Sequence, residues 1–215
     1  MPPVLHGFDP TLLLVLNLAG TFVFGLSGGL EGVRARLDIF GIVVLAMVVG
    51  LAGGITRDLL IGIPPQTVRD WRYLAVAAGS GVVTFVAHTV LTRLERPILV
   101  LDAGGLALFC VTGASTALDH RVPPVEAVVL GAITGVGGGV LRDVLVRQVP
   151  TVLRTGLYAI PALIGAAVVV TASESGSHNL VFPIVGAAVC FAIRLAGIYF
   201  DVNVPRAAGH DDEIG

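Results

Sequence analysis

Two arginine–aspartate pairs lie within apolar segments of this chain, each about one helical turn after a group of glycines. The segments are Gly53-Gly54 followed by Arg57-Asp58, and Gly137-Gly138-Gly139 followed by Arg142-Asp143. A charge at membrane depth costs at least about 2.5–3.5 kcal/mol on insertion scales, so it is normally paired, buried or in contact with water. Adjacent glycines weaken a helix and let other backbones approach closely. Together these residues predict a polar pathway lined by two helices that the glycines interrupt and kink, with carbonyl groups available to cations.

Both features also have a structural interpretation. The glycines have the GxxxG spacing of tightly packed helices, and the charged pairs could mark helix ends at the headgroup level, where arginine reaches water at little cost. If the pairs do line a pathway, neighbours on a helix point about 100° apart and need not bond each other. A two-fold arrangement then predicts that Arg57 approaches Asp143 and that Arg142 approaches Asp58.

Three further polar residues within apolar runs are candidates for the pathway: Ser27, Thr112 and Asp102. The two hydroxyl groups could line the pathway, or they could bond to their own helices, as such hydroxyls often do. Asp102 lies just inside an apolar run, so it is either a pathway carboxylate or an interfacial helix cap.

Other residues are assigned structural roles. Asp38 is expected to cap the start of a helix, and Tyr73 and Tyr158 are expected to be interfacial anchors. Cys110 and Cys190 lie in apolar runs without the spacing of a metal site, so they are expected to be small buried thiols.

The composition requires that most of the surface meets lipid. Of 215 residues, 55% are hydrophobic and 13% charged, and the mean hydropathy is +0.92, whereas a soluble domain carries about 25% charged residues. A net charge of -2 gives no electrostatic case for nucleic-acid binding. Seven apolar runs approach the roughly 20 residues that a spanning helix needs: 11–30, 39–57, 73–92, 97–118, 125–147, 157–173 and 179–200. We expect a single membrane domain with a polar tail at 207–215.

An internal repeat organises these runs. The segment Gly50–Asp58 aligns with Gly135–Asp143, 85 positions later. The same offset pairs Gly20 with Gly105, Phe24 with Phe109, Ser27 with Thr112, Gly28 with Gly113, Pro65 with Pro150, Arg69 with Arg154 and Tyr73 with Tyr158. Repeat one covers about 11–92 and repeat two about 97–173. Three spans in each repeat would invert the second copy, a plan typical of transport proteins, and the run 179–200 forms an unpaired seventh helix.

The arginines predict the orientation, because positive residues favour the cytoplasmic side. All thirteen basic residues are arginine. With the N-terminus outside, seven arginines fall in the inner segments and three in the outer ones. We therefore expect the N-terminus outside and the C-terminus in the cytoplasm.

In combination, the glycine and Arg-Asp segments, the stretch Leu37–Gly41 and the segment Asp102–Leu106 resemble the prokaryotic TRIC (trimeric intracellular cation) channels, also known as UPF0126 or glycine-transporter-like proteins. The likeness covers about residues 11–200. It implies seven helices in two inverted triplets plus one, and a homotrimer in a prokaryotic inner membrane. It also implies a pore in each subunit, kinked at the glycines of the second and fifth spans, that conducts monovalent cations.

The favoured function is therefore a K⁺ channel, with Na⁺ as a second permeant ion and only transient ion binding. The alternative is a secondary transporter of a small amino acid such as glycine, with broken helices binding its charged groups. A membrane enzyme or a structural subunit is disfavoured, because the sequence has no evident nucleophile–base set or metal cluster. We expect no cofactor, although a bound lipid is compatible with the chain.

Overall fold

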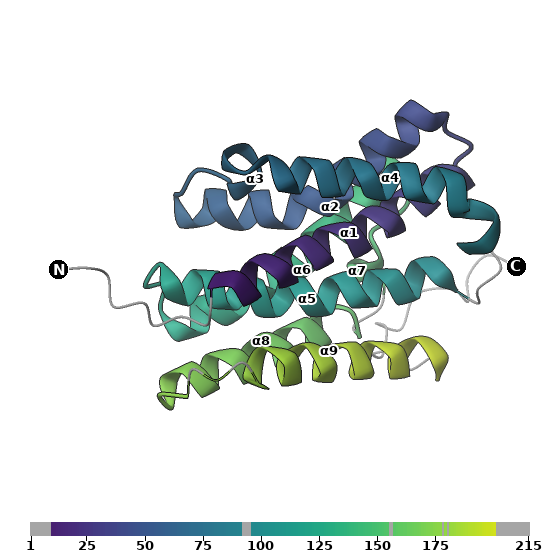
Figure 1. The fold of residues 1–215 in the computed structure, drawn as a ribbon. Coiled ribbons are helices and arrows are strands. Elements are labelled where there is room, and N and C mark those ends of the chain that lie inside the picture. The colour runs from purple at the N-terminus through teal and green to yellow at the C-terminus, as the bar shows by residue number, and fades with distance from the viewer. Residues whose placement is uncertain (1–9, 92–95, 155–156, 178, 180, 201–215) are drawn as a thin grey trace, which may run out of the picture.

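The computed structural model describes residues 10–91, 96–154, 157–177, 179 and 181–200, in which the regular elements are α-helices (Figure 1). In chain order they are α1 (Pro10–Arg34), α2 (Ile39–Ile61), α3 (Gln66–Arg69), α4 (Trp71–Leu91), α5 (Pro97–Asp119), α6 (Pro124–Leu145), α7 (Thr151–Arg154), α8 (Ala159–Glu174) and α9 (Val181–Tyr199). The all-helical class is as predicted. The predicted polar tail at 207–215 lies outside the described residues.

Within the described residues, six helices are long and apolar enough to cross a bilayer: α1, α2, α4, α5, α6 and α9. Helix α8 is also apolar, but it has only 16 residues. At 1.5 Å per residue it is about 24 Å long, less than the roughly 30 Å of a hydrocarbon core. The sequence predicted seven spans, and the run 157–173 is the one whose helix falls short.

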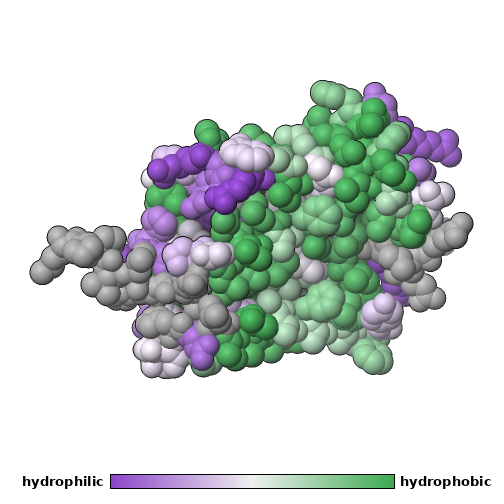
Figure 2. Space-filling model, in the orientation of Figure 1, coloured by the Kyte–Doolittle hydropathy of each residue, from purple (hydrophilic) through white to green (hydrophobic). Residues whose placement is uncertain are grey.

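The outer surface of the spanning helices is apolar. Hydrophobic residues form a broad band across the middle of the face in Figure 2, and hydrophilic residues gather toward its left and right ends. Phe40, Val86 and Val125 are each 74% exposed, which would be unfavourable in water but suits contact with lipid. The surface therefore has the pattern expected of a membrane protein.

Left-handed backbone positions follow corresponding helices in the two halves of the chain. Arg36 has a φ of 57° and Arg121 a φ of 61°, while Gly62 has 82° and Arg147 has 60°. Such values are uncommon outside glycine and are used just beyond helix C-termini. The members of each pair stand 85 positions apart, so the offset seen in the sequence also holds for the backbone of these turns.

The start of α2 is fixed locally. The Asp38 side chain accepts a hydrogen bond from the Gly41 amide at 2.7 Å, which satisfies one of the free donors at a helix N-terminus. The predicted cap is confirmed.

Helices from the two repeats pack into one bundle. Helices α1, α2 and α4 contact one another, as do α5, α6 and α8, and the two groups meet where α1 packs on α5 and α2 on α6. Helix α9 packs against α5 and α8, beside α8 at the bottom of Figure 1. The centre of the bundle is therefore made by α1, α2, α5 and α6.

The glycines of α2 and α6 do not interrupt their helices, contrary to prediction, since both helices are continuous. A Cβ added at Gly53 would collide with the carbonyl oxygen of Thr134, and one added at Gly138 would lie 2.6 Å from the carbonyl oxygen of Val49. These glycines allow the backbones of α2 and α6 to cross in direct contact. Gly54 differs, because a Cβ there would meet nothing within 4 Å.

Candidate functional site

Arg57 and Asp58 form a buried ion pair in the last turns of α2. The Nη2 and Nε atoms of Arg57 lie 2.7 and 2.8 Å from Oδ1 of Asp58. The side chains are 3% and 1% exposed. The Nη1 atom of Arg57 also donates to Oδ1 of Asn17 on α1, at 3.4 Å. Oδ2 of Asp58 accepts from the Gln66 amide at 2.8 Å, at the first residue of α3. We call Asn17, Arg57, Asp58 and Gln66 the first ionic cluster.

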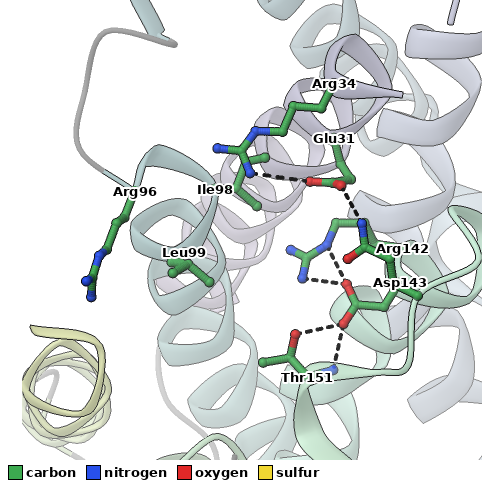
Figure 3. Close-up of a pocket in the computed structure, with 9 residues that line it drawn as sticks. Glu31, Arg34, Arg96, Ile98, Leu99, Arg142, Asp143 and Thr151 are labelled. Atoms are coloured by element: carbon green, nitrogen blue, oxygen red, sulfur yellow. Dashed lines mark hydrogen bonds and ion pairs between the residues drawn. The ribbon is translucent and has the colours of Figure 1, made fainter. Parts of the chain in front are cut away.

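Arg142 and Asp143 form the corresponding pair at the end of α6 (Figure 3). The Nε and Nη2 atoms of Arg142 lie 2.9 and 2.8 Å from Oδ1 of Asp143. The Nη1 atom of Arg142 donates to Asp102 at 2.5 Å and to the Ser27 hydroxyl at 2.7 Å. Oδ2 of Asp143 accepts from the amide of Thr151, the first residue of α7, at 2.7 Å and from its hydroxyl at 2.9 Å. These five residues are the second ionic cluster.

The predicted cross-pairing of Arg57 with Asp143 and of Arg142 with Asp58 is wrong. Each arginine bonds the carboxylate that follows it, and that carboxylate is held in place by the first amide of a short helix. The two clusters also lie too far apart to exchange partners, because Arg57 contacts α1 at Asn17 and Arg142 contacts it ten positions later, about 15 Å along the helix axis.

The two clusters use equivalent positions but differ in charge. Asn17 and Asp102 are 85 positions apart, and both accept from an Nη1 atom. The second cluster therefore has two carboxylates for one guanidinium, whereas the first has one. Sequence reasoning missed Asn17, although the repeat offset aligns it with Asp102. Asp102 is fully buried within α5, so the interfacial-cap interpretation is wrong.

Arg194 is a second residue that the sequence analysis missed. It lies in α9, it is 4% exposed, and its Nη1 donates to the carbonyl oxygen of Leu157 at 2.9 Å. Its guanidinium carbon is 4.7 Å from the ring centroid of Tyr158. The signal was a lone arginine deep in the last apolar run, outside the repeat. Tyr158 is 1% exposed and Tyr73 is 6% exposed, so both rings are packed inside the protein rather than anchored at its outer surface.

The two predicted hydroxyl groups have different surroundings. Ser27 bonds Arg142 on another helix. Thr112 is fully buried, and its hydroxyl has no hydrogen-bond partner among the described residues. The structure therefore brings Ser27 into the second cluster but leaves Thr112 outside both clusters.

A cavity opens beside each cluster. The one at the second cluster has a volume of about 250 Å³, and the one at the first about 10 Å³. Besides Arg142 and Asp143, the larger cavity is lined by Glu31, Arg34, Arg96, Ile98, Leu99, Gln148 and Thr151 (Figure 3). Glu31 accepts from the Gln148 amide group at 3.1 Å. Among the described residues, the two cavities share no lining residue.

The arrangement holds charge in the interior next to water-sized spaces. Within the part of the chain that the structure covers, no three His, Cys, Asp or Glu residues are grouped as a metal site. Cys110 and Cys190 are buried free thiols, as predicted. Paired guanidinium and carboxylate groups beside such spaces can bind small ions, let them pass or exclude them.

Helices of spanning length, an apolar outer surface and buried ionic clusters define a polytopic helical membrane protein. A family model described as "Glycine transporter" matches residues 14–89 and again residues 99–174. The chain is 54% identical over 200 residues to a UPF0126 membrane protein of Streptomyces coelicolor, covering 92% of each chain. It is 40% identical over 200 residues to the UPF0126 inner membrane protein YadS of Escherichia coli, covering 92% of this chain and 97% of YadS. The chain belongs to this UPF0126, or glycine-transporter, family.

Solved structures of channels have the same fold. A crystal structure of a prokaryotic TRIC channel in 0.5 M KCl matches 91% of this chain and 100% of its own, with a TM-score of 0.83 and 34% identity. The TRIC trimeric intracellular cation channel orthologue from Rhodobacter sphaeroides matches 89% of this chain and 100% of its own, with a TM-score of 0.85 and 36% identity. The predicted resemblance is confirmed at the level of fold and family.

Proposed function

We propose that this protein is a cation channel that conducts K⁺, with Na⁺ as a second permeant ion, through a pore within each subunit. The observation that carries the proposal is the match to a TRIC channel structure over 91% of the chain at 34% identity. A match over this share of the chain includes the helices that hold both ionic clusters, and is not limited to the general fold. A channel also fits a chain whose buried charges lie beside cavities.

The two repeats run in opposite directions in this proposal. Arg57, at the end of α2, contacts Asn17 in the first half of α1. Arg142, at the end of α6, contacts Ser27 in the second half of α1. The ends of α2 and α6 therefore approach the same helix from opposite ends, which supports an inverted repeat with α9 as the unpaired helix. This architecture places one ionic cluster toward each side of the membrane.

The pathway runs from one cluster to the other between α1, α2, α5 and α6. Unpaired arginines would repel cations, but each guanidinium here lies within 2.8 Å of a carboxylate oxygen, which offsets its charge. In the second ionic cluster Asp102 adds a second carboxylate, which bonds the same guanidinium at 2.5 Å. In this proposal Gly53, Gly137 and Gly138 keep α2 and α6 close. Together with Gly54 and Gly139 they leave the two helices able to kink during opening.

The assembly and setting follow from the same likeness. We propose a homotrimer with membrane lipids as its surroundings, in a prokaryotic inner membrane, with the N-terminus outside and the C-terminus in the cytoplasm. The seven-to-three distribution of arginines supports this orientation. The proposal includes neither a cofactor nor an enzymatic step. A bound lipid would lie at a subunit surface and needs no site within the chain.

The test is single-channel recording of the purified protein in a planar bilayer, first in symmetric KCl and then in a KCl gradient. We expect unitary steps whose reversal potential lies near the K⁺ equilibrium potential. A reversal near the Cl⁻ equilibrium potential would contradict cation conduction. A silent bilayer, together with saturable uptake of glycine into liposomes by the same preparation, would favour the transporter that the family description names.

A further inference from the structure

Two phenylalanine rings meet at the centre of the bundle, where the repeats face each other. Phe24 of α1 and Phe109 of α5 have ring centroids 5.3 Å apart and planes tilted by 53°. Phe24 is 0% exposed and Phe109 is 2% exposed. The two residues are 85 positions apart, so the repeat supplies the same side chain from both halves of the chain.

Each ring is seated between two glycines that are themselves related by the repeat. A Cβ added at Gly20 would lie 2.5 Å from Phe109, and one added at Gly53 would lie 3.1 Å from it. For Phe24, the corresponding distances are 2.5 Å from Gly105 and 3.5 Å from Gly138. The glycines at these positions leave the space that the rings fill. The pair is therefore a built feature of the two repeats rather than a chance contact in the core.

The pair lies between the two ionic clusters. Phe24 follows Asn17 of the first cluster by seven positions on α1, and Phe109 follows Asp102 of the second by seven positions on α5. Seven residues correspond to about 10 Å along a helix. Phe109 also forms part of the wall of the cavity at the first cluster. On the proposed pathway between α1, α2, α5 and α6, an ion that moves from one cluster to the other passes the two rings.

We infer that Phe24 and Phe109 form the hydrophobic barrier that closes the pore in this conformation. The inference rests on the proposed channel function. A narrow segment lined by aromatic carbon excludes water, and an ion cannot leave its hydration shell there without replacement ligands, so such a constriction blocks current without a charged plug. The ionic clusters attract and balance charge at the two sides, while the phenylalanine pair determines whether the pore is wetted.

The experiment compares the double variant Phe24→Thr/Phe109→Thr with the wild type in planar bilayers and in K⁺-flux liposomes. Threonine shortens each side chain and adds a hydroxyl group, so we expect an open probability about tenfold higher or more, because the central segment is wetted. Phe24→Leu/Phe109→Leu keeps the segment apolar and should retain the closed state. Phe22→Thr, on the same helix but with its side chain partly exposed at 36%, is the matched control and should conduct like the wild type.

The outcomes separate the two proposals. If the wild type opens and closes and the threonine double variant has the same open probability, the proposal of a phenylalanine barrier is wrong, whereas the proposed channel function is retained. If neither protein passes K⁺ although both fold, as judged by circular dichroism and size-exclusion chromatography, the channel itself is wrong. Should the threonine pair not fold, Phe24→Tyr/Phe109→Tyr keeps both rings and adds hydroxyl groups, and an unchanged open probability there would overturn the barrier.

Discussion

Arg194 lies over the ring of Tyr158, with its guanidinium carbon 4.7 Å from the ring centroid. The Tyr158 hydroxyl and Oδ1 of Asp102 both approach the position where a Cβ would stand at Gly139. Arg194 belongs to α9, outside the two repeats. The second cluster has Asp102 at the position where the first has Asn17. This additional carboxylate thus has an additional cation nearby, Arg194, which the unpaired helix α9 supplies. This relationship gives α9 a role in the electrostatics of the interior.

The variants Asp102→Asn and Arg194→Gln should be coupled. Asp102→Asn leaves the two buried arginines around it with one carboxylate fewer, so we expect a lower free energy of unfolding. Adding Arg194→Gln should recover part of that loss, with a coupling of about 0.5–3 kcal/mol, as is found for residues in one network. The measurement is thermal unfolding in detergent for the wild type, both single variants and the double variant. Combining Asp102→Asn with Arg72→Gln, whose side chain is 50% exposed, serves as an additive control, and additivity in both pairs would contradict the coupling.

Asp58→Asn should destabilise the fold more than Asp143→Asn. Removing one partner of a buried ion pair costs about 3–5 kcal/mol when the remaining charge has no other partner. After Asp58→Asn, Arg57 retains only the neutral Asn17 at 3.4 Å. After Asp143→Asn, Arg142 still has Asp102 at 2.5 Å. Denaturant unfolding of the two variants under one set of conditions tests this order, and equal losses would mean that Asp102 does not compensate.

The same two variants should lower the unitary K⁺ conductance. Each leaves an arginine less compensated within the proposed pathway, and an uncompensated positive charge repels cations. Glu126→Gln, at an exposed position in the first turn of α6, changes the net charge equally and should leave the conductance unchanged. Single-channel recordings at low ionic strength give the largest contrast, because salt screens such effects. A conductance reduced as much by Glu126→Gln would point to surface charge instead.

Gly54→Ala and Gly139→Ala should differ in their effects on stability. A Cβ at Gly54 meets nothing within 4 Å, so alanine should be tolerated and can stabilise the helix by about 1 kcal/mol. A Cβ at Gly139 would collide with the Tyr158 hydroxyl, so alanine should destabilise. Thermal unfolding tests this order. If Gly54→Ala folds normally but no longer conducts, flexibility of α2 is required for opening, whereas normal conduction would limit the glycines to packing.

Much of the fold could be read from the sequence, because its causes are local or repetitive. A hydrocarbon core fixes the length of an apolar run, so the predicted spans agree with the helices to within four residues at each end. Helix α2 continues past its predicted end at 57 to Ile61, since the charges of Arg57 and Asp58 neutralise each other and do not end the helix. The cap at Asp38 was predictable because it involves only residues within one turn.

The tertiary structure decided which groups meet. The sequence predicted crossed partners for Arg57 and Arg142, but each bonds the aspartate that follows it, because the first amides of the short helices α3 and α7 hold the two carboxylates. The sequence repeat placed Phe24 and Phe109 at equivalent positions of the two halves, but their contact depends on how α1 packs on α5. The position of Arg194 over Tyr158 depends on where α9 docks, and no period in the sequence encodes that. Length, polarity and register are properties of one segment and its copy, whereas partners are chosen by packing between segments that are distant in the chain.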